Sequence, residues 1–101
     1  MRVGIGFDIH RLVRGRDLVL GGVKIPFEKG LLGHSDGDVV LHALADAILG
    51  ACGGPDIGTL FPDTDEKFRG MDSAEIVRKA LEVAGRARLR PVNADVVVVC
   101  E

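Results

Sequence analysis

The chain has 101 residues, of which 47% are hydrophobic and 28% charged, and its formal net charge is -2. This length suits one domain with a modest core, and the composition is typical of a soluble globular protein. The chain has four Phe and neither Trp nor Tyr. Without a basic surface or aromatic stacking platforms, nucleic acid is excluded as an expected partner.

Cysteine usage and the N-terminus indicate the compartment. Cys52 and Cys100 form neither a disulfide framework nor a CxxC metal pair, which favours a reducing, intracellular setting. The N-terminus has neither an apolar signal core nor an Arg/Ser-rich transit segment. Apolar stretches such as residues 96–100 are far shorter than the roughly 20 residues of a membrane span. We therefore expect a cytoplasmic protein with no membrane partner.

Two β elements are predicted near the N-terminus. Residues 2–10 alternate, which predicts a strand with one apolar face and one face of glycines that ends in Asp8 and His10. Residues 18–26 predict a hairpin, in which Gly21-Gly22 supplies the positive φ angles of a tight turn.

The middle of the chain predicts two helices. Apolar residues at helical spacing predict a helix from about residue 38 to residue 52, after the glycine-rich connection 27–37. The segment 56–70 is irregular and long for a mere connection, and long ordered loops are often functional. Asp72 then caps a second helix, with Glu75 as its capping-box partner.

The last predicted element is a strand over residues 92–101. Residues 96–99 are apolar on both faces, which is typical of a central strand. Because the chain stops directly after it, we interpret 1–101 as a single domain truncated at its C-terminus. The preceding Arg86, Arg88 and Arg90 indicate a solvated connection more than an anion site.

A metal site is suggested by spacing. Asp8 and His10 are two apart on the predicted strand, so both side chains point the same way from Cα atoms roughly 6.6 Å apart, with small glycines leaving room beside them. His42 lies in the first or second turn of the predicted helix, and Asp46 on the same face can accept its second N–H. An Asp/His/His set with an open fourth position is the pattern of catalytic zinc. The alternative is two polar strand ends and one packed helix histidine.

The stretch 34–38 combines His34, Ser35, two acids and a glycine at a predicted helix start. Free N–H groups there are a ready anion site, so one interpretation is a phosphate cradle with His34 donating to a phosphoryl oxygen. An N-cap with solvated acids is the alternative, and the stretch alone favours it. Composition does not decide whether two further segments are turn chemistry only: Asp56-Ile57-Gly58 and Phe61-Pro62-Asp63-Thr64-Asp65.

Taken together, these residues resemble one family, the 2-C-methyl-D-erythritol 2,4-cyclodiphosphate synthases of the non-mevalonate isoprenoid pathway. The matching pieces follow the family's order and spacing across nearly the whole chain. They are Gly4 to His10, Leu20 to Pro26, His34 to Asp38, His42 to Ala47, Asp56 to Gly58 and Leu60 to Asp65.

The resemblance implies an α+β fold, a ferredoxin-like two-layer sandwich with helices on one face of a four-stranded mixed sheet. It implies homotrimers with active sites at subunit interfaces. Zn²⁺ would be bound by Asp8, His10 and His42, and His34 would be the catalytic residue that steadies the transition state. The implied substrate-binding residues are Asp8, Ile9, His10, His34, Ser35, Asp56, Ile57, Gly58, Phe61, Pro62, Asp63, Thr64 and Asp65.

The implied activity is that of a phosphorus-oxygen lyase acting on a nucleotide diphosphate. The 2-phosphate of 4-diphosphocytidyl-2-C-methyl-D-erythritol 2-phosphate attacks the β-phosphorus, an eight-membered cyclic diphosphate forms and CMP leaves. Zinc would act as a Lewis acid on a β-phosphate oxygen, and holding both phosphates in line would lower the barrier further. No side-chain nucleophile is required, and none is evident.

The chain departs from the family at its end. The family continues with a Thr-Thr-Glu stretch, whose Glu binds a second divalent cation, Mg²⁺ or Mn²⁺, and with most of the cytidine pocket. Only Cys100 and Glu101 represent the start of the nucleotide-binding loop. We therefore expect the 101 residues alone to bind zinc but not to release CMP.

Two rival functions fit the same residues. A zinc phosphoesterase using metal-bound water would release inorganic phosphate in place of CMP. A non-catalytic, zinc-stabilised trimeric module would keep its function after His34→Ala but would unfold after His42→Ala.

Overall fold

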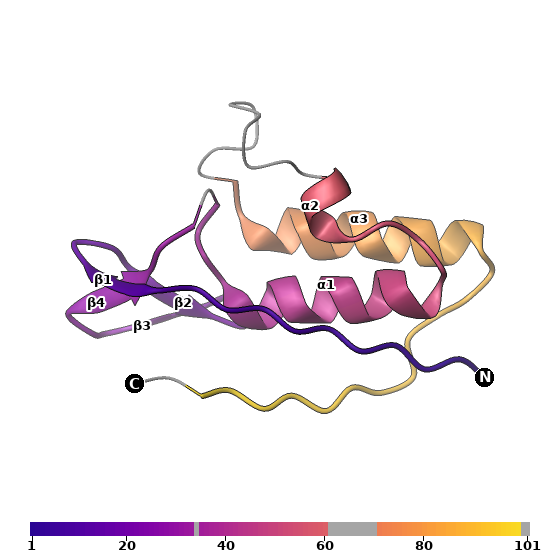
Figure 1. The fold of residues 1–101 in the computed structure, drawn as a ribbon, viewed down its shortest axis with the longest axis horizontal. Coiled ribbons are helices and arrows are strands. Elements are labelled where there is room, and N and C mark those ends of the chain that lie inside the picture. Colours follow the sequence, from indigo (N-terminus) through magenta and orange to yellow (C-terminus); the bar gives the residue numbers. More distant parts are fainter. Residues whose placement is uncertain (34, 61–70, 100–101) are drawn as a thin grey trace.

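The computed structural model describes residues 1–33, 35–60 and 71–99. They form an α+β fold of four short strands and three helices, drawn in Figure 1. Each strand has three residues, and together they make two separate two-stranded antiparallel sheets. The elements in chain order are β1 (Leu12–Arg14), β2 (Leu18–Leu20), β3 (Val23–Ile25), β4 (Lys29–Leu31), α1 (Val39–Ala51), α2 (Ile57–Leu60) and α3 (Ser73–Arg86).

The predicted hairpin is confirmed. β2 pairs with β3, with Leu18 opposite Ile25 and Leu20 opposite Val23. Gly21 and Gly22 form the turn with φ angles of 62° and 81°. Glycine adopts this left-handed conformation without the penalty that a Cβ brings, and it matches the twist of the two strands.

The pair β1–β4 was not predicted from the sequence. Its ladder joins Leu12 to Leu31 and Arg14 to Lys29, and β4 lies inside what the sequence suggested was a plain connection. Three-residue strands carry too little alternation to stand out as a pattern. This ladder brings the end of the N-terminal stretch close to the loop before α1.

Both predicted long helices are confirmed. α1 begins after the N-cap Asp38 and ends at Ala51, with Cys52 as its C-cap, and α3 begins after the N-cap Asp72. The predicted capping-box partnership of Asp72 with Glu75 is not observed: the Asp72 carboxylate accepts from the N–H of Ala74, and the Glu75 carboxylate pairs with Arg78. α1 and α3 pack side by side and bury the main core, which consists of Ala45, Leu49, Ile76 and Ala80.

The segment expected to be irregular contains a short helix. α2 begins directly after Asp56, whose carboxylate accepts hydrogen bonds from the backbone and the hydroxyl of Thr59 at 2.9 and 3.0 Å. The turn chemistry recognised in the sequence is therefore an N-cap. Residues 61–70 lie outside the described part of the chain.

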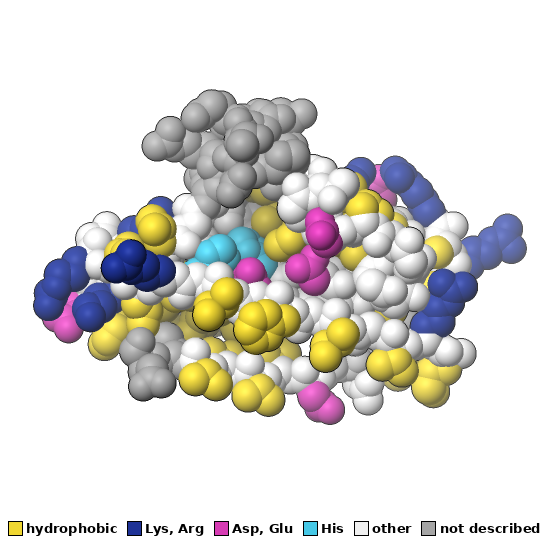
Figure 2. All heavy atoms as spheres, viewed as in Figure 1, with side chains coloured by type: hydrophobic (Ala, Val, Ile, Leu, Met, Phe, Trp, Pro, Cys, Tyr) yellow, Lys and Arg dark blue, Asp and Glu magenta, His cyan; other side chains and the backbone are white. Residues whose placement is uncertain are grey.

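The expected four-stranded mixed sheet is not formed by the described residues. Residues 2–10 and 92–99, predicted as strands, have no ladder partner among them, and a strand needs the backbone of a neighbour to complete its hydrogen bonds. In Figure 1 residues 1–10 run as an extended chain along α1. Apolar side chains of both segments are exposed, including Ile5 at 89% and Val97 at 90%, and Figure 2 shows hydrophobic side chains gathered along this side.

The N-terminal stretch lies against α1 through its glycines. A Cβ on Gly4 would overlap the carbonyl oxygen of Ala47, and a Cβ on Gly6 would overlap that of Ala43. The glycine face was expected to leave room beside Asp8 and His10, but helix backbone fills that room. Glycine is required here for close approach, which places the end of the stretch over the first turns of α1.

Within the described residues, the structure has no helix with the length and apolar character of a membrane span.

Candidate functional site

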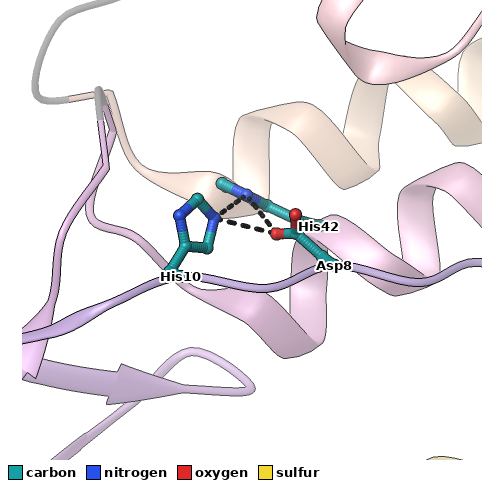
Figure 3. A group of neighbouring side chains, drawn as sticks. All are labelled: Asp8, His10 and His42. Atoms are coloured by element: carbon teal, nitrogen blue, oxygen red, sulfur yellow. Dashed lines mark hydrogen bonds and ion pairs between the residues drawn. The ribbon is translucent and has the colours of Figure 1, made fainter.

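The structure brings Asp8, His10 and His42 together (Figure 3). Oδ2 of Asp8 lies 2.8 Å from Nε2 of His10 and 3.0 Å from Nδ1 of His42, and the two nitrogens are 3.2 Å apart. Three atoms with available lone pairs therefore point at one another. The sequence prediction that these three side chains converge is confirmed.

Backbone contacts help to place two of the three side chains, those of His10 and His42. Asp8 and His10 leave the same side of the N-terminal stretch, and His10 also forms a hydrogen bond with the backbone of Leu32. His42 lies in the first turns of α1, where its backbone N–H donates to the carbonyl of Asp38 at 3.0 Å. The side chain of Ile9 is 76% exposed, as alternation along an extended chain requires, and lies outside the cluster.

The cluster is strongly polarised. Burial would raise the pKa of Asp8, but its close side-chain contacts with His10 and His42 outweigh that effect and hold the pKa well below its usual value. The hydrogen bond to Asp8 raises the pKa of His10 above its usual 6.5, against the opposing effect of burial. In the metal-free chain, a positive charge is thus favoured beside an ionised carboxylate. A divalent cation bound at this position would stabilise the ionised carboxylate more strongly than a protonated histidine does.

The donor set and its dimensions fit zinc. One carboxylate and two imidazoles are common zinc ligands, and tetrahedral bonds of about 2.0 Å separate ligand atoms by roughly 3.3 Å. The observed separations of 2.8–3.2 Å are close to that value. Side chains of Asp8 and His10 are 20% and 19% exposed, and histidine atoms are visible at the surface in Figure 2. A fourth ligand can therefore approach from outside.

The other ring nitrogen of His42 faces hydroxyl groups, and sequence reasoning missed one of them. Nε2 lies 2.8 Å from Oγ of Ser73 and 3.1 Å from Oγ of Ser35. Ser73 is completely buried at the start of α3 and also contacts the carboxylate of Asp36 through its hydroxyl and its backbone N–H. Ser73 and His42 are 31 residues apart, so no local pattern could have connected them.

Asp46 does not orient His42, contrary to the prediction. Its Oδ1 accepts a hydrogen bond from the backbone N–H of Ile57 at 2.9 Å. A spacing of four residues places two side chains on one helix face but does not make them meet, because other partners compete. Asp46 instead joins α1 to the start of α2, where Asp56 and Gly58 are exposed.

The start of α1 is an N-cap, and it is buried. The side chain of Asp38 is 0% exposed and accepts hydrogen bonds from Val40 and Leu41 at 3.1 Å, and from Gly21 and Gly22 at 2.9 and 2.6 Å. The N–H groups of Val40 and Leu41 are therefore not free for an anion. The N-cap interpretation is confirmed for Asp38, although this acid is buried and not solvated, and the phosphate-binding role of His34 stays a prediction.

Only some of the remaining predicted substrate-binding residues lie in the described part of the chain. Ser35 is buried beside His42, and its carbonyl accepts a hydrogen bond from Arg16 at 2.9 Å. Asp56, Ile57 and Gly58 surround the start of α2. The catalytic candidate His34 and the segment Phe61, Pro62, Asp63, Thr64 and Asp65 lie outside the described residues.

Known proteins match the chain along its entire length. The 2-C-methyl-D-erythritol 2,4-cyclodiphosphate synthase of Geobacillus kaustophilus is 56% identical over 100 residues, which are 99% of this chain and 63% of that protein. The chain therefore spans less than two thirds of that relative.

Solved structures agree with the sequence match. A synthase of the same name superposes with a TM-score of 0.78 at 53% identity, covering 84% of this chain and 57% of that one. A form of the synthase with bound CDP gives a TM-score of 0.77 at 50% identity, with the same coverage. The profile of the YgbB family matches residues 1–101. The chain belongs to the YgbB family and is a relative of the 2-C-methyl-D-erythritol 2,4-cyclodiphosphate synthases.

Proposed function

We propose that the full-length protein carrying these residues cyclises 4-diphosphocytidyl-2-C-methyl-D-erythritol 2-phosphate to 2-C-methyl-D-erythritol 2,4-cyclodiphosphate and releases CMP. The observation that carries this proposal is the convergence of Asp8, His10 and His42 in a chain that matches the synthases over its whole length. The CDP bound to a related synthase supports a cytidine nucleotide as the leaving portion of the substrate.

Zinc is the proposed metal. Asp8, His10 and His42 would hold it through Oδ2, Nε2 and Nδ1, the three atoms that face one another. When bound, the metal supplies Lewis acidity to a phosphoryl oxygen and partly neutralises the charge of two approaching phosphates. A second divalent cation, Mg²⁺ or Mn²⁺, is proposed for the whole protein on the resemblance alone.

The chain's own residues bind and orient the substrate in this proposal. His34 and Ser35 would hold its phosphates, and the position of Ser35 beside His42 supports this, because it places the loop next to the metal ligands. The start of α2 at Asp56, Ile57 and Gly58, with residues 61–65, would contact the erythritol portion. Holding both phosphates at one site converts their encounter into an intramolecular step, and no side-chain nucleophile is needed.

We also propose the complete architecture that the resemblance implies. It is a ferredoxin-like sandwich with a four-stranded mixed sheet, assembled as a cytoplasmic homotrimer with active sites between subunits. The exposed apolar side chains of residues 2–10 and 92–99 support this, because such faces are typical of sheets and interfaces that become covered. Light scattering of the purified full-length protein tests the trimer, and a monomeric mass would contradict it.

The reaction is tested by identifying the phosphorus products. The zinc-loaded full-length protein is incubated with the diphosphocytidyl substrate and magnesium, and the products are followed by phosphorus NMR. Equal amounts of CMP and cyclic diphosphate support the proposal, whereas inorganic phosphate would identify a phosphoesterase. In the same assay His34→Ala should abolish turnover while leaving zinc bound. Unchanged turnover in His34→Ala would contradict the role of His34.

A further inference from the structure

The two ring nitrogens of His42 face different surroundings. Nδ1 faces the carboxylate of Asp8 and the imidazole of His10, whereas Nε2 faces two buried hydroxyls, with Ser73 the nearer at 2.8 Å. A neutral imidazole carries one proton, and the nitrogen that holds it cannot bind a metal. The partners of Nε2 therefore decide whether Nδ1 is available.

The contact between Ser73 and Asp36 determines which partner receives the Ser73 hydroxyl proton. Burial would raise the pKa of Asp36, but hydrogen bonds from the Ser73 hydroxyl and from the backbones of Ser73 and Asp38 lower that pKa, so the carboxylate is ionised at neutral pH. An ionised carboxylate only accepts hydrogen bonds. The single hydroxyl proton of Ser73 therefore goes to Asp36, and lone pairs of Ser73 remain for His42.

We propose that Ser73, held by Asp36, is a positioning residue for the metal centre: it accepts the N–H of His42 at Nε2 and so keeps Nδ1 unprotonated toward Asp8 and His10. The opposite tautomer would donate from Nδ1 to Asp8 at 3.0 Å and occupy the metal-facing nitrogen with a proton. Ser73 shifts this balance before any metal arrives. The inference depends on the proposed metal site, but not on the reaction performed there.

Burial makes the contact effective. Ser73 is 0% exposed and His42 is 6% exposed, so water does not readily replace the hydroxyl. Ser35 lies 3.1 Å from Nε2 and 3.3 Å from Oγ of Ser73, and it accepts a long hydrogen bond from Gly37 at 3.4 Å. No carboxylate among the described residues fixes the hydroxyl of Ser35. It can therefore replace Ser73 only in part.

The test measures zinc affinity by competition with a chromophoric chelator, using the full chain. Ser73→Ala is expected to weaken zinc binding by about 10- to 100-fold, the usual effect of losing a partner of a ligating histidine. Ser73→Thr keeps the hydroxyl and should restore most of the affinity. Asp36→Asn should also weaken zinc binding. An amide NH₂ can donate to Ser73, so the Ser73 hydroxyl proton would no longer be held toward residue 36.

A spectroscopic measurement separates positioning from stability. Nitrogen-15 NMR of the metal-free wild type should show His42 with its proton on Nε2, and Ser73→Ala should move population to the Nδ1–H form. A wild-type His42 protonated on Nδ1 would overturn the proposal, even if Ser73→Ala fails to fold. Wild-type zinc affinity in a folded Ser73→Ala chain would overturn it as well.

His42→Ala distinguishes failure of this inference from failure of the metal site. If His42→Ala abolishes zinc binding while Ser73→Ala changes nothing, the site stands and the positioning role is wrong. If both variants bind zinc as the wild type does, the metal site itself is wrong and the inference falls with it.

Discussion

The carboxylate of Asp46 accepts a hydrogen bond from the backbone N–H of Ile57 at 2.9 Å, which links α1 directly to the start of α2. This contact connects the helix that carries His42 to the loop proposed to hold the erythritol portion of the substrate. This hydrogen bond therefore helps to hold the proposed metal site and that loop in a fixed arrangement.

Asp46→Ala is expected to release the start of α2. The lost hydrogen bond should lower the free energy of unfolding by about 1 kcal/mol, and the Ile57 amide should exchange its hydrogen faster. Asp46→Asn is the matched control, because its amide oxygen can still accept from Ile57. Chemical denaturation and hydrogen exchange measure both effects. Equal protection of Ile57 in wild type and Asp46→Ala would contradict this role.

Asp38 and Asp72 both cap helices, yet they should respond differently to replacement by Asn. Asp38 is fully buried and uses both oxygens, so an amide NH₂ would face the N–H of Gly22 and cost about 2–4 kcal/mol. Asp72 is exposed and accepts one bond from Ala74 at 2.9 Å, which Asn can also accept. Thermal unfolding should show a large loss of stability for Asp38→Asn and almost no loss of stability for Asp72→Asn. Similar losses would contradict the buried role of Asp38.

Gly6→Ala is expected to push the N-terminal stretch away from α1. The new methyl group would overlap the carbonyl of Ala43, which should cost about 1–3 kcal/mol and displace Asp8 from His42, so zinc affinity should fall. Gly85→Ala is the control, because nothing lies within 4 Å of that position and alanine favours a helix. Calorimetry with zinc follows both variants. Wild-type zinc affinity in Gly6→Ala would contradict the need for close approach.

Zinc affinity should depend on pH through His10. Its pKa is raised above 6.5 in the metal-free chain, so below that pKa the metal must displace a proton. Affinity should therefore fall as pH decreases through the raised pKa and level off above it.

The metal-free chain should show the opposite dependence in its stability. A raised histidine pKa contributes stability that is complete below pH 6.5 and is lost as pH rises through the folded-state pKa. Zinc-binding calorimetry measures the first trend, and thermal unfolding of the chain in chelator measures the second, both from about pH 5 to about pH 9. A zinc affinity independent of pH below the raised pKa of His10 would contradict the assignment of His10 as a ligand.

Local patterns in the sequence predicted the elements that local interactions determine. Apolar residues at helical spacing marked the first long helix, the cap Asp72 marked the second, and the turn Gly21-Gly22 marked the hairpin, because these signals depend on residues close together in the sequence. The spacing of Asp8 and His10 was enough to place both on one side of the stretch.

Contacts between distant residues could not be predicted in this way. Asp46 was assigned to His42 but binds Ile57, and Ser73, which no sequence pattern singled out, contacts His42. Alternation in residues 2–10 indicated extended backbone correctly, but pairing depends on which neighbours are present. In each case the missing information is the tertiary arrangement, which one sequence does not specify locally.

We propose that Asp8, His10 and His42 together bind one zinc ion. Anomalous scattering at the zinc edge, from crystals of the full chain grown with zinc, tests this most directly. We expect one strong peak bonded to Oδ2 of Asp8, Nε2 of His10 and Nδ1 of His42, at about 2.0–2.1 Å from each. A zinc-replete crystal with no peak among these three atoms would contradict the claim.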